Sequence, residues 1–299
     1  MSKVLLQDPF GNSAYPVTTD GCVVSVGDAT YEGEKVNISG SHRCNITEVG
    51  SLVPSTSGMS PQGILYSEDY VYQFYNGGYV DVFSIEDIES GTDASAIRSF
   101  TIPNTSGVHF GGIDWFDESN KIFITHNRAN NSLYKINIYN ESNIVVETIP
   151  TPDIPSSVIA HEGIVCYDGM NECIYLTGYL HSDEGDTTSA RIGLVIYRIN
   201  PDTGSAVIMR NLPVFHLQDS KFYNGRIFYA NDSTTGTASG YNTQRVIVVD
   251  VNSGIVSKII IPNISSIEAE GICIVGGKWI YETMAASSSR VRVNKIQFG

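Results

Sequence analysis

The sequence predicts an all-β protein folded as a five-bladed β-propeller. Three observations support this prediction. A strand-like motif that ends in an apolar residue and proline recurs along the chain, and a second motif follows it. One copy of the first motif lies near the N-terminus, ahead of the first complete repeat. Successive copies lie 49, 47, 63 and 49 residues apart. A period in the forties of strand sequence is typical of propeller blades. The five copies are Val53-Pro54, Ile102-Pro103, Ile149-Pro150, Leu212-Pro213 and Ile261-Pro262.

The second motif ends in glycine and isoleucine and marks the expected innermost strand of each blade. Four copies keep this pattern, whereas the copy in the fourth repeat is degenerate and reads Gln218-Asp219-Ser220. The regular copies are Gln62-Gly63-Ile64, Gly111-Gly112-Ile113, Glu162-Gly163-Ile164 and Glu270-Gly271-Ile272.

Each repeat divides into four short runs with alternating apolar and polar residues, the pattern of strands in stacked sheets. In the second repeat the runs are 112–116, 121–125, 133–138 and 144–149. The other blades are expected at 60–103, 155–213, 214–262 and from residue 267 onward. Asn224-Gly225 supplies the positive φ angles that a tight hairpin requires.

The last repeat contains three strands and no fourth, and residues 45–54 match the missing one. We therefore expect this N-terminal strand to complete the last blade and close the ring, because closure removes exposed sheet edges. The propeller then spans 45–299. Residues 1–44 form a separate segment without a core of its own, which we expect to pack on the propeller, another copy or a larger assembly.

Composition excludes several classes of function. The net charge of −14 disfavours nucleic acid as a partner. The five cysteines form no CxxC pair, which disfavours a metal cluster or a disulfide framework. No apolar run is long enough to span a membrane, and the N-terminus lacks the apolar core of a signal peptide, so we expect a chain made in the cytoplasm.

The opening residues Lys3–Thr19, with Leu5-Leu6, Gly11 and Tyr15-Pro16-Val17-Thr18, resemble the start of virion-attached fibre and appendage proteins of tailed phages that infect Bacteroidetes (crAss-like phages). The phrase Pro61-Gln62-Gly63-Ile64, followed by Tyr72–Tyr75, looks like distal modules of such proteins. The resemblance implies a structural virion protein that faces the host surface.

A first candidate site is a ring of residues that precede the inner strands and should circle the mouth of the central channel. Its members are Gln62, Gly111, Glu162, Gln218 and Glu270, with His109 and His161 adjacent. Two carboxylates with amide oxygens could bind calcium or another ligand. They could also act as the acid–base pair of a glycosidase, or form a hydrogen-bonded polar collar that sets the register of the blades.

A second candidate ring follows the second strand of each blade and should share a face with the first. Its members are Tyr75, His126, Gly178, Asn231 and Met284, with neighbours Asn76, Asn127, Tyr179, Asp232 and Glu282. Aromatic and amide side chains together suit sugar recognition, although polar residues are also ordinary at strand ends.

The sequence contains no nucleophile elbow, phosphate-binding loop, dinucleotide fingerprint or HExxH motif. We therefore assign no catalytic residue, metal or cofactor. The predicted function is a virion fibre, spike or appendage component that binds a host-surface glycan or protein, with several copies per particle and residues 1–44 attached to other virion proteins. The alternatives are a carbohydrate-active enzyme and an architectural subunit. The predicted ligand-binding residues are Gln62, Glu162, Gln218, Glu270, Tyr75, Asn76, His126, Asn127, Tyr179, Asn231 and Asp232.

Overall fold

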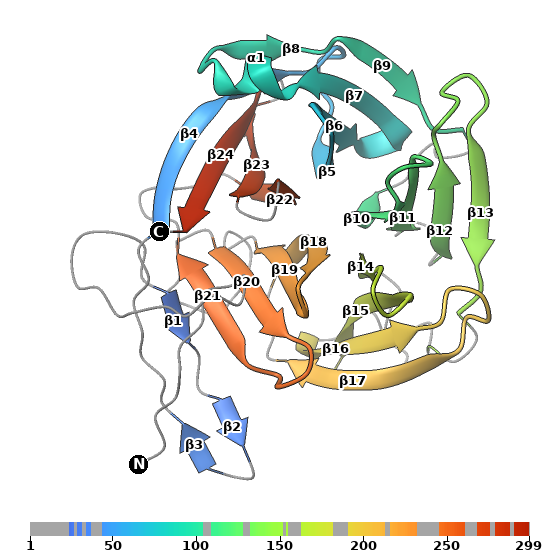
Figure 1. Cartoon of the computed structure of the whole chain (residues 1–299), viewed down its shortest axis with the longest axis vertical. Coiled ribbons are helices and arrows are strands. Elements are labelled where there is room, and N and C mark those ends of the chain that lie inside the picture. Colours follow the sequence, from blue (N-terminus) through green and yellow to red (C-terminus); the bar gives the residue numbers. More distant parts are fainter. Residues whose placement is uncertain are drawn as a thin grey trace.

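Five sheets of four or five strands surround a central axis in the computed structural model, which confirms the predicted five-bladed propeller (Figure 1). Each blade has its innermost strand at the axis and its later strands progressively further out. The structure describes residues 24–26, 29–31, 34–36, 44–103, 109–127, 132–151, 154, 163–181, 191–212, 216–231, 245–260, 268–275, 279–287 and 290–298.

The strands follow the predicted order within every blade. Blade one contains β5 (Pro61–Ser67), β6 (Tyr70–Tyr75), β7 (Tyr79–Ser84) and β9 (Arg98–Thr101). Blade two contains β10 (Phe110–Asp117), β11 (Ile122–Asn127), β12 (Ser132–Asn137) and β13 (Val145–Ile149). Blade three contains β14 (Ile164–Asp168), β15 (Cys173–His181), β16 (Arg191–Ile199) and β17 (Ala206–Leu212). Blade four contains β18 (Leu217–Tyr223), β19 (Arg226–Asn231), β20 (Arg245–Asp250) and β21 (Val256–Ile260).

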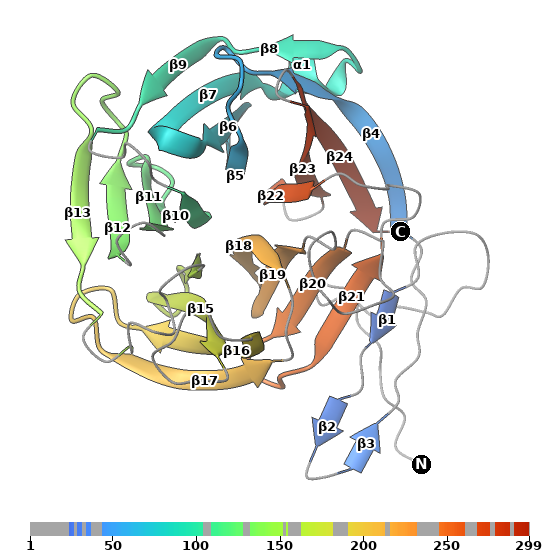
Figure 2. The same cartoon turned by 180° about the vertical axis from the view of Figure 1, so that it is seen from behind.

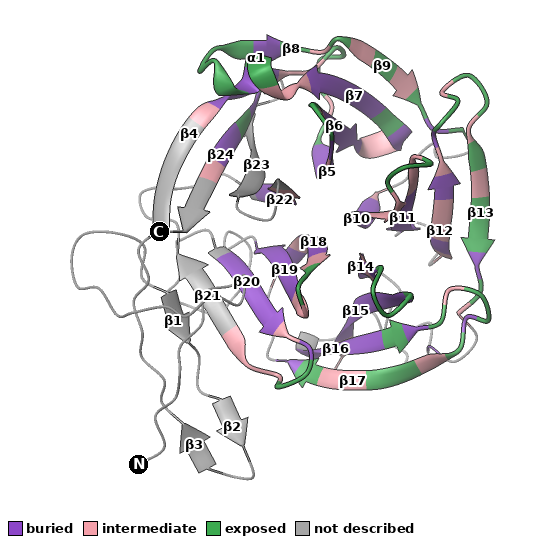
Figure 3. Ribbon diagram, in the orientation of Figure 1, coloured by how far each residue is buried: buried purple, intermediate pink, exposed green. Residues whose placement is uncertain are grey.

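Burial falls from the axis outward, as Figure 3 shows. Every described residue of β6 after Tyr70 is buried, because this strand is covered by blades on both faces. The outer strand β13 instead has mostly exposed or half-buried residues. The core lies between blades: Phe74 of blade one packs edge-on against Phe110 and Phe123 of blade two, with ring centroids 6.2 and 5.0 Å away. Such aromatic contacts hold adjacent blades together.

The hairpin between β18 and β19 turns at Asn224-Gly225, as predicted. These residues have φ angles of 47° and 75°. Both values lie in the left-handed region that asparagine and glycine tolerate best, and this geometry matches the twist of the flanking strands.

The ring is closed by an N-terminal strand, also as predicted. Blade five contains β22 (Glu268–Val275), β23 (Trp279–Ser287), β24 (Arg290–Phe298) and β4 (Cys44–Val53), which is its fourth strand. β4 runs antiparallel to β24, with Leu52 opposite Val291 and Cys44 opposite Phe298 (Figures 1 and 2). The two ends of the propeller sequence are thus hydrogen-bonded to each other.

An insertion in blade one pairs with the outer edge of the closing strand β4. It consists of the short helix α1 (Ile85–Glu89) and β8 (Asp93–Ser95), and β8 pairs in parallel with β4. Asp93 accepts a hydrogen bond from Ser51 of β4 and forms an ion pair with Arg290 of β24 at 2.6 Å. The insertion gives blade five a fifth strand that the sequence did not predict.

The N-terminal segment also contributes to the ring. β1 (Val24–Val26) pairs antiparallel with β21 and becomes the fifth strand of blade four. β2 (Ala29–Tyr31) and β3 (Glu34–Val36) pair with each other as a hairpin apart from the blades (Figures 1 and 2). Of the partners expected for residues 1–44, the propeller itself is therefore one. Among the described residues, no helix is long and apolar enough to cross a membrane.

If β4 closes the ring, removing its buried anchor will destabilise the whole propeller. Leu52 of β4 is fully buried among Val291, Val293 and Cys273. We expect Leu52→Ala to lower the free energy of unfolding by about 2–5 kcal/mol, because it leaves a cavity in the core, measured by urea denaturation.

Ile208→Ala is the matched control, because Ile208 is 63% exposed on the outer strand β17 and should change stability by less than about 0.5 kcal/mol. Equal, small effects of the two substitutions would contradict the closing role of β4.

Candidate functional site

The predicted first ring lies where the inner strands begin. Gln62, Gln218 and Glu270 each occupy a β-bulge, because the pairing skips them between Pro61 and Gly63, Leu217 and Asp219, and Ala269 and Gly271. In blade two the bulge falls at Gly112, one residue after the predicted Gly111. Bulges redirect side chains at strand ends. Glu162 and His161 lie outside the described residues.

The side chains of the first ring are largely enclosed. Gln62 and Glu270 are only 3% and 6% exposed, and Gln218 is half-buried. The Gln62 amide donates to the carbonyl oxygen of Pro61 at 2.7 Å. This environment fits the polar collar considered in the sequence analysis better than an open ligand site.

Strand pairing revises the alignment of the second ring by one residue in two blades. Ile64, Ile113 and Ile164 pair with Gln73, Thr125 and Thr177, respectively. Tyr75 lies two residues after Gln73. The residues two positions after Thr125 and Thr177 are Asn127 and Tyr179, so these are the equivalents of Tyr75, not His126 and Gly178. A shift of one residue moves a side chain to the opposite face of its strand, so His126 does not belong with Tyr75. Asn231 and Met284 keep their predicted positions.

The second ring is buried rather than presented to solvent. Tyr75, His126, Asn127, Tyr179 and Asn231 are each at most 6% exposed. Two of them, Tyr179 and Asn231, hold neighbouring segments together. The Tyr179 hydroxyl of blade three accepts the Leu217 amide of blade four at 3.2 Å, and the Asn231 side chain accepts the His216 amide at 3.1 Å.

Two other predicted residues differ from this group. Asn76 is half-buried, and its backbone N–H donates to the carbonyl oxygen of Ser60. Asp232 lies outside the described residues. The connections that follow β11, β15 and β19 on this face also fall largely outside them.

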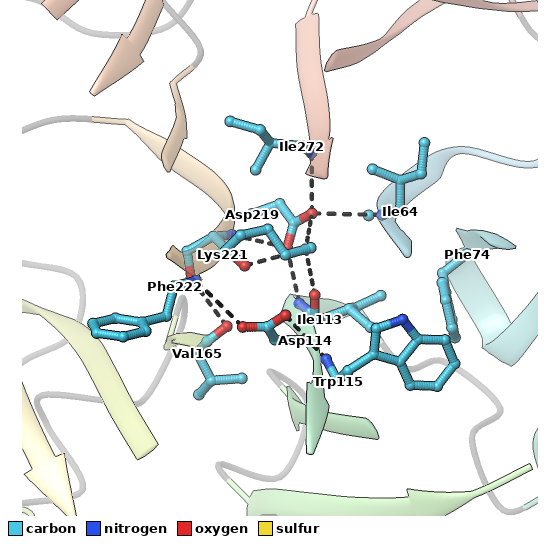
Figure 4. Close-up of polar contacts among 12 residues, drawn as sticks. Ile64, Phe74, Ile113, Asp114, Trp115, Val165, Asp219, Lys221, Phe222 and Ile272 are labelled. Atoms are coloured by element: carbon cyan, nitrogen blue, oxygen red, sulfur yellow. Dashed lines mark hydrogen bonds and ion pairs between the residues drawn. The ribbon is translucent and has the colours of Figure 1, made fainter. Parts of the chain in front are cut away.

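Sequence reasoning missed the polar group at the centre of the ring. Asp219, from the degenerate copy of the second motif, is completely buried at the axis (Figure 4). Its carboxylate accepts backbone N–H groups from three other blades, at Ile64, Ile113 and Ile272, with distances of 3.5, 2.8 and 3.1 Å. It also accepts the amide of Ser220 at 2.8 Å. These four amides occupy equivalent positions in four blades.

Lys221 neutralises this carboxylate from the same strand. Its ammonium lies 2.9 Å from the Asp219 carboxylate, and the residue is 5% exposed. It also donates to the carbonyl oxygens of Ile113 and Ser220, so all three of its hydrogen-bond donors have acceptors. Ser220 donates from its hydroxyl to the carbonyl oxygen of Val165 in blade three at 2.9 Å.

Asp114 completes this set of residues, here called the axial cluster: Asp114, Asp219, Ser220 and Lys221. The Asp114 carboxylate accepts the amides of Trp115, Tyr167 and Phe222 at 3.0, 2.9 and 3.4 Å (Figure 4). Burial raises the pKa of Asp114 to about 7, against the opposing influence of the Lys221 ammonium and of the Tyr167 and Phe222 amides. Burial likewise raises the pKa of Asp219.

The glycines beside the cluster show how crowded the axis is. A Cβ atom on Gly112 would lie 2.5 Å from the amide nitrogen of Val165 in the next blade, and one on Gly63 would lie 3.0 Å from the Ile113 side chain. Strands can approach this closely only without a side chain. The recurring glycine therefore reflects packing at the axis, and the one repeat with aspartate supplies the side chain that fills it.

A cavity of about 140 Å³ opens beside the cluster, toward the ends of the inner strands rather than their beginnings. It lies between β5, β10, β18 and β22. Its lining residues are Leu65, Tyr66, Asp114, Trp115, Lys221, Phe222, Tyr223, Cys273 and Ile274. Within the described part of the chain, no group of three or more histidine, cysteine or acidic residues has the arrangement of a metal site.

Comparisons with known proteins show the fold and no more. No protein family model and no curated protein sequence matches this chain. Among solved structures, an exo-β-1,3-galactanase from Phanerochaete chrysosporium, a Glu→Ala variant in complex with β-1,3-galactotriose, is similar with 13% identity and a TM-score of 0.52. The match covers 83% of this chain and 64% of the galactanase chain. A Bacteroides thetaiotaomicron protein of unknown function matches with 12% identity over 95% of this chain and 84% of that one, with a TM-score of 0.46.

The Asp219–Lys221 ion pair predicts a specific pattern of stability. Asp219→Asn leaves a buried ammonium without its counter-charge, and Lys221→Met leaves a buried carboxylate without its cation. We expect each to cost about 3–5 kcal/mol. The double variant should cost clearly less than the sum, because no unpaired charge remains. Denaturant unfolding of the four proteins measures this coupling, and strictly additive losses would rule it out.

The raised pKa of Asp114 predicts a pH dependence of stability. Between the free-side-chain value of 3.8 and about 7, the folded protein holds a proton that the unfolded chain has released. The free energy of unfolding therefore falls as the pH rises through this window, by at most about 1.4 kcal/mol per pH unit. Asp114→Asn removes this contribution. The difference in stability between wild type and variant should change from pH 5 to pH 7 and then level off, and a constant difference would contradict the assignment.

Proposed function

We propose that this chain is the recognition module of a virion fibre or appendage protein, and that it binds a surface glycan or protein without catalysing a reaction. The observation that supports the proposal is that the axial carboxylates accept hydrogen bonds from backbone amides. Asp219 accepts four backbone amides and an ammonium, and Asp114 accepts three amides. Asp219 is committed to holding inner strands together, and Asp114 has one acceptor position left, so the two do not provide the pair of open carboxyl groups that a glycosidase needs.

The second candidate is a carbohydrate-active enzyme that uses axial carboxylates. A glycosidase requires two carboxyl groups on either side of the scissile bond, about 5–9.5 Å apart. Of the predicted pair, Glu270 is 6% exposed at the beginning of β22, and Glu162 lies outside the described residues. Propellers serve many functions, so the shared fold does not favour either candidate.

The role on a particle rests on the resemblance of residues 3–19 to virion proteins. The pairing of β1 with β21 fits a segment that leads from an attachment point onto the propeller. Several copies on one particle would raise avidity without tight binding at a single site.

One experiment separates recognition from catalysis. The full-length wild type and its Glu270→Gln variant are applied to a glycan array and incubated with the oligosaccharides that bind. Glu147→Gln is the matched control, because Glu147 lies on the outer strand β13 with a side chain that is 61% exposed.

We expect binding by all three proteins within about twofold and no released sugar, because the proposed contacts do not need an ionised Glu270. Release of sugar by wild type and the control, at a rate that Glu270→Gln lowers by about 10³-fold or more, would favour the glycosidase over the binding module. Absence of the chain from purified particles, tested by mass spectrometry, would remove the virion role separately.

A further inference from the structure

The axial cavity lies away from both predicted rings and has its own polar chemistry. It is formed between the second halves of β5, β10, β18 and β22. Two charged residues line it, Asp114 and Lys221, which are 8% and 5% exposed. The close-up in Figure 4 shows both side chains at the axis between the inner strands.

Only one of these charges can take a new partner. The Lys221 ammonium already donates to Ile113, Asp219 and Ser220, which uses all three of its donors. The Asp114 carboxylate has about four acceptor positions, and three are filled by backbone amides. The remaining position is on Oδ1, which accepts the Trp115 amide and no other group among the described residues. The charged chemistry left in the cavity is therefore that of a hydrogen-bond acceptor with negative charge.

The walls and the surroundings favour a small organic cation. Aromatic and aliphatic residues, including Tyr66, Trp115 and Ile274, make up most of the lining. The volume of about 140 Å³ is close to that of cavities that hold a single benzene molecule. The net charge of −14 attracts cations to the protein as a whole.

We propose that this cavity binds a primary alkylammonium group of about the size of the end of a lysine side chain, with the ammonium donating to Asp114. Such a ligand matches both the acceptor and the apolar residues that line the cavity. It could be a free amine or a lysine of a partner protein, and both present the same chemistry. The inference does not depend on the proposed function.

Binding should depend on pH because a proton and the ammonium compete for the same carboxylate. The charged groups that act on Asp114 are Lys221 and Asp219 of β18, and the Cys166 thiol of β14 is close enough to be influenced by it. Asp114 has a pKa of about 7. Affinity for the cation should therefore fall about tenfold for each pH unit below 7 and be constant above it.

The test uses the full chain and n-butylammonium chloride as the probe, with 1-butanol as the neutral analogue of similar shape. Affinities are measured at pH 8 by titration in NMR or calorimetry. We expect n-butylammonium to bind at least about tenfold more tightly than 1-butanol, because only the cation forms an ion pair. Nα-acetyl-lysine methylamide distinguishes the two sources. If it binds as tightly as n-butylammonium, the ligand is a partner's lysine. If it binds at least about tenfold more weakly, the ligand is a free amine.

Two controls keep the proposal open to refutation. Asp114→Asn should weaken n-butylammonium binding by about tenfold or more, whereas Asp202→Asn, which removes the same charge from an exposed turn, should not. If Asp114→Asn fails to fold, the pH profile of the wild type decides. No binding of n-butylammonium, equal binding of 1-butanol, or an affinity that does not change between pH 6 and 8 would overturn the proposal.

Discussion

The acceptance of four backbone amides by a single buried carboxylate is the interaction on which the rest of this propeller depends. The innermost strand of each blade has one edge with no neighbouring strand, and its polar groups need partners once they are buried. Asp219 supplies the acceptor for Ile64, Ile113 and Ile272, and Lys221 supplies the compensating charge. Blade three joins the same network through the Ser220 hydroxyl and the Asp114 carboxylate. All five inner strands are thereby linked at the axis.

This arrangement limits what the central channel can do. In a propeller with an open channel, axial carboxylates can face a substrate, whereas here the Asp219 carboxylate faces backbone amides of neighbouring blades. The aromatic and amide residues that seemed suited to sugar recognition are enclosed as well, and Tyr179 connects blades three and four. Recognition, if it occurs on this face, must use the connections beyond the strand ends. A cavity at the axis lies at the other end, beside Asp114.

The periphery shows a second constraint, the unpaired edge of each outer strand. The chain covers two of these edges with its own segments: β1 lies along blade four, and β8 lies along the closing strand β4. Ion pairs of Asp93 with Arg290 and of Glu89 with Lys295 join blade one to the closure at the surface. Ring closure is therefore supported both in the core, by Leu52, and at the rim.

The number of blades, the order of the strands and closure by residues 45–54 could all be predicted from the sequence, because strand periodicity and repeat spacing are local patterns. The role of Asp219 could not. Its amide partners are 155, 106 and 53 residues away in the chain, and they meet only when the ring closes. The departure of the fourth repeat from the Gly-Ile pattern was the available signal, yet a lost motif and a new function look alike in a single sequence. Burial of Tyr75 and Asn127 was likewise decided by packing between blades. The sequence of a polar strand end does not show which residues of other blades will cover it.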